Sequence, residues 1–316
     1  MVLAKKVSVL FAGLGSIGCR HLKNLSVACR RRGLALEADA LRHAAAPLPD
    51  DISTLIRQEY VSADELPRYD LAFICNPTQR HLETMRLLDG KAAHVFVEKP
   101  VFVRPVDAVA LGPFRDASRY YVACPLRHTR VFAFLREFVR ANRVFAARAI
   151  CSSYLPEWRP GRDYRTLYSA AADSGGVKID LIHEFDYLFD LFGFPVRTHM
   201  VSRKLSDLEI ACPDSVSFIG DYADMTVELH LDYYGRKAQR SIELYTSEDV
   251  VRCDFLKSEA RFLRAERVVR LPEERNASCL REIEYFLDFA LAGKANINDV
   301  VYANDVLAAI QEDSVC

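Results

Sequence analysis

Residues 158–165, WRPGRDYR, gather side chains that are well suited to binding a ligand. The aromatic residues, Trp158 and Tyr164, offer flat faces on which a sugar ring or a base can stack. Three arginines can each hold a carboxylate or a phosphate through paired hydrogen bonds: Arg159, Arg162 and Arg165. Pro160–Gly161 is typical of a turn. We therefore expect a loop that covers an anionic sugar; the alternative is an arginine-rich contact between subunits.

A second set of candidate residues, Asp180, His183 and Asp186, recurs at intervals of three in DLIHEFD. In a helix this spacing brings the side chains onto one face. A histidine with a pKa of about 6.5 exchanges protons near neutral pH, so His183 is a candidate proton relay and Asp180 its partner. The apolar neighbours leave open that His183 is a core residue. The glycine pair at 175–176 would allow a ligand to approach closely.

The motif GLGSIG, residues 13–18, has the glycine spacing that cradles a pyrophosphate. An apolar run at 6–12 precedes it and a helical pattern at 17–31 follows it, which is the context that a dinucleotide-binding turn needs. The N-terminus of such a helix attracts phosphate through its free N–H groups and its dipole. We therefore expect the cofactor to contact Gly13, Gly15, Ser16, Ile17 and Gly18.

The choice between NAD and NADP is read near the end of the second expected strand, residues 34–41. Glu37 and Asp39 lie at about the separation expected for an acid that holds the ribose hydroxyls of NAD. Arg42, at the tip of the strand, instead favours the 2′-phosphate of NADP. The sequence leaves both cofactors open and leans slightly towards NADP.

Further strands alternate with helical stretches and predict a parallel, doubly wound sheet. These strands cover residues 34–41, 70–77, 93–100 and 119–125. A helix is expected from Thr78 to Leu88. Ligands of such sheets bind at the carboxyl ends of the strands. The candidate residues at these ends are Asn76, Pro77, Glu98, Lys99 and Pro100.

The composition narrows the class of protein. A chain of 316 residues suggests two domains at roughly 150 residues each. The net charge of −1 gives no general attraction for nucleic acid or anionic lipid. The nine cysteines are scattered without CxxC or zinc-ligand spacing, so we expect reduced thiols and no metal site. Glycines interrupt the one apolar run near the N-terminus, and no segment is long enough to span a membrane; we expect a cytoplasmic protein.

In their order and spacing, GLGSIGCRHLKNL, CNPTQRH, VEKP and GGVKIDLIHEFDYLFDLFG resemble the glucose–fructose oxidoreductase / inositol dehydrogenase family, Gfo/Idh/MocA. The likeness spans nearly the whole chain. It implies an α/β protein with a Rossmann NAD(P)-binding domain, residues 1–124, and a second α/β domain, residues 125–316, that carries a large, mostly antiparallel open sheet. The C-terminal helix would be able to pack back on the Rossmann domain. Family members commonly form dimers or tetramers through the outer face of that sheet.

The resemblance also implies roles for single residues. Lys99 of VEKP would reach the substrate hydroxyl beside the nicotinamide, and it would act with His183 and Asp180 in catalysis. In much of the family the acid precedes the histidine by four positions, whereas here Asp180 precedes it by three, so the role of Asp180 is less certain. The residues expected to border the nicotinamide ribose are Asn76, Pro77, Thr78 and His81. His81 could equally face solvent.

Two further sets of residues could contact a ligand or a partner subunit, and the sequence does not show which. Residues with polar or aromatic side chains alternate along a strand-like segment, with one face expected towards the substrate and the other towards a partner subunit. They are His230, Asp232, Tyr233, Arg236 and Arg240. Arg127 and His128, just after the Rossmann half, could also approach the pocket.

These observations favour an NAD(P)-dependent oxidoreductase that acts on a carbinol carbon of an anionic or nucleotide-linked sugar. The stretch SSYLPEWRPGRDYRTLYSA is similar to a branch associated with surface-polysaccharide and sugar-acid biosynthesis. One alternative is a non-catalytic NAD(P)-binding sensor or scaffold that keeps the fold. Another is an enzyme whose tightly bound cofactor passes hydride between two sugars. Metal catalysis and nucleic-acid binding are not expected, and a homodimer or homotetramer is.

Overall fold

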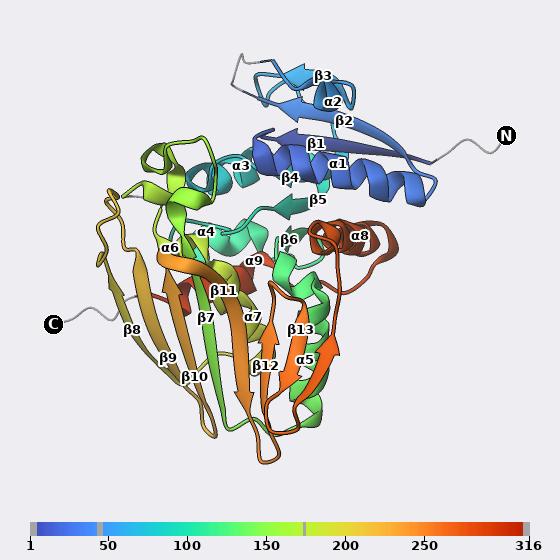
Figure 1. Cartoon of the computed structure of the whole chain (residues 1–316). Helices are drawn as coiled ribbons and strands as arrows, with labels where there is room; N and C mark the ends of the chain where they lie inside the picture. The colour runs from blue at the N-terminus through green and yellow to red at the C-terminus, as the bar shows by residue number, and fades with distance from the viewer. Residues whose placement is uncertain (1–4, 43–46, 173–174, 312–316) are drawn as a thin grey trace. The chain divides into compact units, whose positions relative to one another are not determined.

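The computed structural model describes residues 5–311 except 43–46 and 173–174. The described chain falls into two compact units (Figure 1). The first comprises residues 1–124 and 276–305, and the second comprises residues 125–275 and 306–316. Residues 276–305, which the sequence analysis assigned to the second domain, therefore make their contacts within the first unit.

The first unit contains a six-stranded parallel sheet in the order β3-β2-β1-β4-β5-β6. Its strands are β1 (Lys6–Ala12), β2 (Ala35–Leu41), β3 (Ile56–Tyr60), β4 (Tyr69–Ile74), β5 (Ala92–Val97) and β6 (Tyr120–Val122). The expected doubly wound sheet is confirmed. Strand β3 was not anticipated, because its sequence IRQEY has three exposed polar residues in a row at the edge of the sheet.

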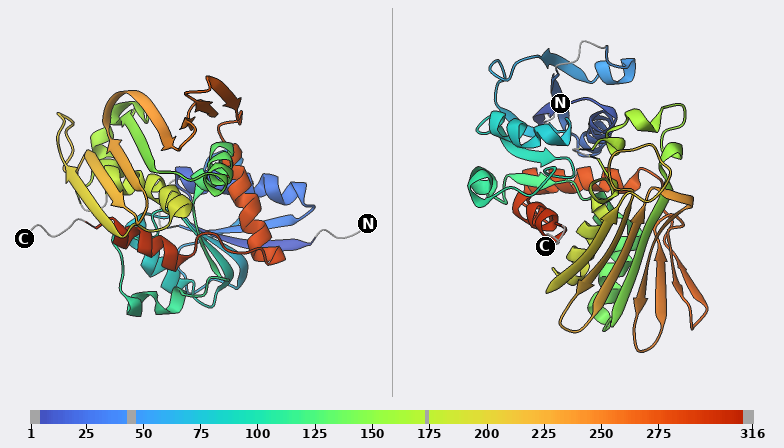
Figure 2. Two further views of the ribbon diagram at one scale, coloured as in Figure 1. Left: turned by 90° about the horizontal axis from the view of Figure 1, so that it is seen from below. Right: turned by 90° about the vertical axis from the view of Figure 1, so that its left-hand side faces the viewer.

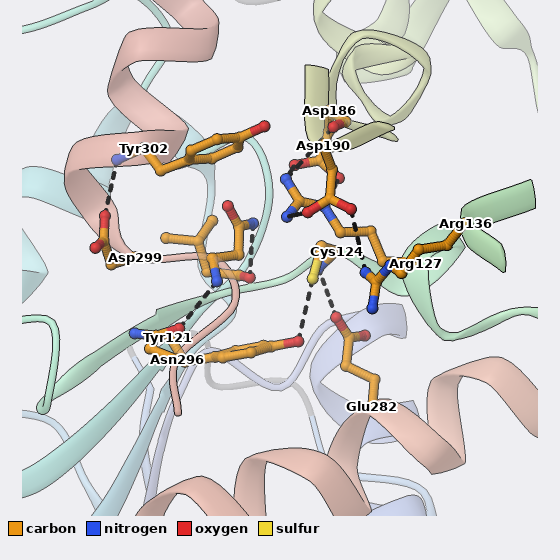
Figure 3. Close-up of polar contacts among 12 residues, drawn as sticks. Tyr121, Cys124, Arg127, Arg136, Asp186, Asp190, Glu282, Asn296, Asp299 and Tyr302 are labelled. Carbon is orange, nitrogen blue, oxygen red and sulfur yellow. Dashed lines mark hydrogen bonds and ion pairs between the residues drawn. The ribbon is translucent and has the colours of Figure 1, made fainter. Parts of the chain in front are cut away.

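Helices pack against this sheet and bury its apolar side chains. They are α1 (Ser16–Arg31), α2 (Asp50–Ser53), α3 (His81–Leu87), α4 (Ala108–Leu111) and α8 (Ala277–Ala292). Phe73 and Phe96, on neighbouring strands, stack at 5.0 Å, and Phe286 of α8 packs edge-on against both at 5.3 Å. Glu282 of α8 also accepts the backbone N–H of Cys124 at 2.5 Å (Figure 3). These contacts hold α8 in the first unit, although about 150 residues separate it from β6.

The second unit is built on an eight-stranded sheet in the order β14-β13-β12-β11-β7-β10-β9-β8. Only β7 and β10 pair in parallel, and the other neighbours are antiparallel. The strands are β7 (Ala146–Tyr154), β8 (Arg197–Arg203), β9 (Ser215–Asp221), β10 (Thr226–Asp232), β11 (Tyr234–Tyr245), β12 (Val250–Asp254), β13 (Glu259–Phe262) and β14 (Arg267–Arg270). The mostly antiparallel second sheet expected from the family resemblance is confirmed.

Three helices, α5 (Arg130–Ala141), α6 (Val177–Asp180) and α7 (Ile182–Phe192), lie along one face of this sheet (Figure 2). Side chains on that face, such as Phe218, are buried, and Phe185 of α7 packs edge-on against Phe218 at 5.2 Å. Side chains on the other face, such as Val201 and Ile219, are about half exposed. The remaining helix, α9 (Val300–Ala309), belongs to the first unit up to Asp305 and to the second from Val306. In the described residues no helix is long and apolar enough to cross a membrane.

A buried ion cluster fixes α7 within the second unit (Figure 3). The side chain of Arg127 is fully buried and donates to both carboxylate oxygens of Asp186, at 2.6 and 2.9 Å. It also lies 2.6 Å from Asp190, one helical turn further on, and Asp190 in turn pairs with Arg136. Burial raises the pKa of Asp186, and the charge of Arg127 opposes that rise. Arg127 is therefore a structural residue that is enclosed by α7, and the expectation that it approaches a ligand is wrong.

The ion cluster gives a prediction about stability. Replacing Asp186 with Asn leaves the buried Arg127 with a single carboxylate partner, and breaking a buried pair in this way costs about 3 kcal/mol. Urea unfolding of the D186N variant, followed by the fluorescence of Trp158 in the same unit, should show a matching fall in the free energy of unfolding. The exposed pair Arg148–Glu228 is the control, and E228Q should change stability by less than about 1 kcal/mol. Equal effects of D186N and E228Q would contradict the assignment.

Candidate active site

The glycine motif joins three elements of the first unit with almost no space to spare. Gly13 has φ +99°, and a Cβ atom there would lie 2.7 Å from the backbone N of Asn76. A Cβ atom on Gly18 would lie 2.3 Å from the carbonyl oxygen of Gly13. The N–H of Gly13 donates to the carbonyl of Leu41 at 3.2 Å. The ends of β2 and β4 and the first turn of α1 can meet at this loop only because Gly13 and Gly18 have no side chains.

Gly15 differs from the other two glycines because it faces open space. No atom lies within 4 Å of the position that its Cβ would take. Gly15 caps α1 without a side-chain hydrogen bond, and no acidic residue stands in the first turn of the helix. The N–H groups of Ser16 and Ile17 thus begin a helix whose positive end faces open space. This arrangement is compatible with the predicted pyrophosphate site.

The two acids on β2 do not lie where a ribose could reach them. Asp39 is fully buried and accepts hydrogen bonds from Arg57 at 2.7 and 3.0 Å and from Tyr69 at 2.9 Å. Glu37 pairs with Lys6 at 2.6 Å and with Arg57 at 3.0 Å, in the middle of the strand. The expectation that Glu37 or Asp39 holds the ribose hydroxyls is therefore wrong. Arg42 does follow the end of β2, and its guanidinium lies 2.6 Å from Glu59 of β3.

The CNPTQRH segment forms a braced turn at the carboxyl end of β4. His81 is 1% exposed, and its Nε2 and Nδ1 lie 3.0 and 3.2 Å from the carbonyls of Asn76 and Val101. Burial lowers the pKa of His81, so a neutral ring donates to one of these carbonyls. Neither expected position for His81 is found, because the ring faces neither solvent nor an open site. Within the described residues, the buried Oδ1 of Asn76 has no hydrogen-bond partner.

The remaining residues of this segment stay candidates. Pro77 is exposed and Thr78 is half-buried, at the start of a 3-10 turn over Thr78–Arg80 that leads into α3. Asn76 donates from Nδ2 to Thr84 at 2.7 Å, which fixes the direction of its unpartnered oxygen. These three residues could border a cofactor as the sequence predicted.

Lys99 is half-buried and directly follows Glu98, whose carboxylate has two hydrogen-bond partners. Glu98 accepts the backbone N–H of Lys99 at 3.0 Å and lies 2.5 Å from Nε2 of His21. Burial alone would raise the pKa of Glu98, but the hydrogen bond with His21 and the charge of Lys99 hold the pKa below its usual value. Glu98 is therefore a fixed anion that positions the backbone of Lys99. The sequence analysis did not identify His21, although it stands three residues after the last glycine of the motif.

In the second unit, the helix expected to carry Asp180 and His183 is broken between them. Helix α6 ends at Asp180, Leu181 adopts φ −96° and ψ 25°, and α7 begins at Ile182. The prediction of one continuous helical face for Asp180, His183 and Asp186 is therefore wrong. Asp180 is buried and accepts the hydroxyl of Tyr233 at 2.6 Å, while His183 is half-buried in the first turn of α7.

The two glycines before α6 serve the packing of the chain. A Cβ atom on Gly175 would lie 2.5 Å from the carbonyl oxygen of Tyr168, and Gly176 has φ +101°. The space at Gly175 is thus filled by the backbone of the preceding loop, so the expectation that this glycine admits a ligand is wrong.

The loop that contains Trp158 is linked to Asp180 through one tyrosine. Trp158 is 36% exposed, donates from Nε1 to Ser153 at 2.9 Å and packs edge-on against the ring of Tyr233 at 5.3 Å. Tyr233 is fully buried, and burial followed by the charge of Asp180 raises its pKa well above the usual value, so it remains a hydrogen-bond donor. Trp158, Tyr233 and Asp180 therefore form a continuous contact from the surface to the end of α6.

The three arginines of this loop differ in their surroundings. Arg165 is engaged by two acids of the same unit, Asp163 at 2.8 Å and Glu209 at 2.7 Å. Arg159 and Arg162 are exposed and pair with no carboxylate in the described parts of the chain. Tyr164 accepts the backbone N–H of Glu209 at 3.1 Å. Arg165 and Tyr164 thus hold the loop in place, whereas Arg159 and Arg162 keep their charges available to an anion.

The expected single strand across residues 230–240 is two strands, since β10 ends at Asp232 and β11 begins at Tyr234. His230 and Asp232 pair at 3.1 Å on the face that the helices leave uncovered. Arg240 points to the opposite face, where its Nε lies 2.9 Å from the fully buried Glu184 of α7. Arg236 stacks over the ring of Tyr154, with its guanidinium carbon 3.9 Å from the ring centre.

Comparison with known proteins identifies the fold. Residues 7–114 match the GFO_IDH_MocA family model, described as an oxidoreductase family with an NAD-binding Rossmann fold. No curated protein sequence matches the chain. Among solved structures, UDP-N-acetylglucosamine 3-dehydrogenase from Acidithiobacillus ferrooxidans is 18% identical, with a TM-score of 0.75 over 96% of this chain and 95% of that one.

Two other solved structures have the same fold. A levoglucosan dehydrogenase in complex with NADH and levoglucosan is 14% identical, with a TM-score of 0.81 over 97% of this chain and 96% of that chain. The myo-inositol 2-dehydrogenase from Lactobacillus plantarum is 18% identical, with a TM-score of 0.74 over 96% of this chain and 95% of that chain. At these identities the likeness establishes the fold alone.

The glycine loop allows binding and stability to be separated. A methyl group at Gly18 would meet a backbone carbonyl, so G18A should lower the free energy of unfolding by about 1–3 kcal/mol. A methyl group at Gly15 has room in the protein and should leave stability unchanged. It would stand where a phosphate approaches, so G15A should weaken NADH binding roughly tenfold or more. NADH fluorescence titration and urea unfolding of both variants test this, and undiminished NADH affinity in G15A would contradict the placement.

Proposed function

We propose that this chain is an enzyme that transfers a hydride to or from a carbinol carbon of an anionic sugar, since residues 7–114 match the model of an oxidoreductase family with an NAD-binding Rossmann fold. The sugar would be nucleotide-activated or carboxylate-bearing and would serve polysaccharide biosynthesis. UDP-N-acetylglucosamine 3-dehydrogenase, which has the same fold, acts on a sugar of the first kind by its name. The same proposal places the enzyme in the cytoplasm, where scattered cysteines stay reduced.

The observation that carries the proposal is the contact from Trp158 through Tyr233 to Asp180. A partly exposed indole is the side chain on which a sugar ring or a uracil base stacks. Its neighbour Tyr233 holds the carboxylate that stands three residues before His183. A ligand stacked on Trp158 would therefore be held beside the segment that contains the candidate proton-transfer residue.

The charge of the sugar is inferred from Arg159 and Arg162. Both guanidinium groups are exposed and unpaired among the described residues, within four positions of Trp158. Two exposed guanidinium groups three positions apart, without a carboxylate partner in the described residues, offer an incoming anion two charged donors. A phosphate or carboxylate on the sugar would supply that anion through paired hydrogen bonds.

The chemistry needs a group that takes or returns the hydroxyl proton while a nicotinamide cofactor, when bound, accepts or supplies the hydride. We assign Lys99 to hold the substrate hydroxyl, with its backbone fixed by Glu98. We assign His183 to exchange the proton with solvent and Asp180 to orient the segment that bears His183.

The finer choice of cofactor is also part of the proposal. The family model describes NAD binding, and Arg42 at the end of β2 favours acceptance of NADP as well. The assembly that we propose is a homodimer or homotetramer through the uncovered face of the second sheet. On that face Val201 and Ile219 are 54% and 47% exposed, which gives a partner subunit apolar surface to cover.

Replacing Lys99 tests the catalytic assignment. A positioned proton-transfer group contributes roughly 10²–10⁴-fold in rate, so K99A should lower kcat by about that factor on any sugar that the wild type oxidises. NADH affinity, measured by fluorescence, should stay within a factor of about three because the pyrophosphate site is untouched. A K99A variant with full turnover would remove Lys99 from catalysis.

The anion site is tested by three matched arginine variants. R159A and R162A each remove an available charge-assisted contact and should raise the sugar KM roughly ten- to hundredfold, with the KM for the cofactor unchanged. R165K is the control, because a lysine can keep the pairing with Asp163 and Glu209 that holds the loop, and it should raise the KM for the sugar much less. Equal effects of all three variants would indicate a structural loop and would argue against an anionic sugar.

A further inference from the structure

Two opposite charges, Arg42 and Glu59, lie at the carboxyl end of β2. In dinucleotide-binding sheets this is where the ribose of the cofactor binds. Arg42 follows the last residue of the strand, and its guanidinium lies 2.6 Å from the carboxylate of Glu59. The backbone joins the same two strands, because the N–H of Arg42 donates to the carbonyl of Tyr60 at 2.9 Å. The neighbouring strand β3, which the sequence analysis did not anticipate, thus brings an acid to the end of β2.

This pair stands next to the glycine loop. Leu41, the residue before Arg42, accepts the N–H of Gly13. Burial and the charge of Asp51 raise the pKa of the Cys19 thiol in the first turn of α1, and the positive charges of Lys23 and Arg42 oppose the rise. The charge of Arg42 is therefore felt at the end of the helix where a pyrophosphate fits.

Among the acids of β2 and β3, Glu59 is the one whose carboxylate remains able to meet a ligand. Asp39 is fully buried and Glu37 is engaged by Lys6 and Arg57, as described above. The side chain of Glu59 is 48% exposed, whereas that of Arg42 is 11% exposed. An ion pair with one partner in water is weak, so a ligand group can compete for Arg42.

We propose that Glu59 is a specificity-determining residue that sets the preference between NAD and NADP. Its carboxylate can accept a ribose hydroxyl while it remains paired with Arg42. A 2′-phosphate carries negative charge, so it must displace Glu59 from Arg42 and then stand beside a second anion. Glu59 therefore favours NAD, and Arg42 without Glu59 favours NADP. The inference rests on the NAD-binding part of the proposed function and does not depend on the sugar.

The test compares direct binding of NADH and NADPH to the full-length protein by nucleotide fluorescence. E59Q removes the charge and keeps the size, and it should shift the ratio of the two dissociation constants at least tenfold towards NADPH. R42A should shift the ratio in the opposite direction. Since Glu59 is half-exposed, E59Q should fold as the wild type does, and circular dichroism checks the folding of both variants. E59A serves as a second charge-removing variant.

The possible results distinguish failure of the Glu59 inference from failure of the proposed sugar substrate. An unchanged ratio in both E59Q and E59A would overturn it. A shift in E37Q instead of E59Q would also overturn it, and would restore the acid on β2 as the determinant. Because no sugar is present, failure to find an anionic substrate would leave the result standing. Wild-type protein that binds neither nucleotide would overturn this inference together with the NAD-binding premise.

Discussion

The close approach of backbone to backbone at Gly13 and Gly18 is the constraint on which the first unit depends. Two side-chain-free positions let the ends of β2 and β4 meet the first turn of α1, with separations that no Cβ atom would permit. That contact leaves Gly15 facing open space, directs the helix N-terminus outwards, and sets Arg42 beside the same loop. The proposed pyrophosphate site and the proposed determinant of cofactor choice both depend on this one packing arrangement.

In the second unit, Tyr233 joins the loop that contains Trp158 to Asp180. Tyr233 lies at the junction of β10 and β11, and its ring supports Trp158 while its hydroxyl holds Asp180. The buried cluster around Arg127 fixes α7 from the other side. The segment that bears His183 is therefore anchored at both ends, as the proposed role of His183 in catalysis requires.

Local sequence patterns predicted the strands and the glycine turn. They failed where contacts with residues distant in the sequence determine the burial and the partners of a side chain. The run KVSVLFA matched β1 at both ends, and GLGSIG predicted the close-packed turn from β1 into α1, because strand pattern and glycine spacing are local properties. The break at Leu181 has no glycine or proline to mark it. Asp39 and His81 were read as ligands because spacing does not reveal burial, and both are saturated by partners from other elements. Tyr233, His21 and Glu59 acquire their importance only through contacts across 53, 77 and 17 residues, which no local pattern contains.

The most direct measurement is the apparent melting temperature of the protein with NADH and a panel of sugars that differ in charge. Matched pairs such as a hexuronate and its hexose, or a UDP-sugar and its free sugar, isolate the anionic group. A ligand that binds only the native state at about a hundred times its Kd stabilises it by about 2.7 kcal/mol. We predict that NADH raises the melting temperature and that an anionic sugar, but not its neutral counterpart, raises it further by a few degrees. Stabilisation by neutral sugars or cyclitols equal to that by their anionic partners would contradict the account.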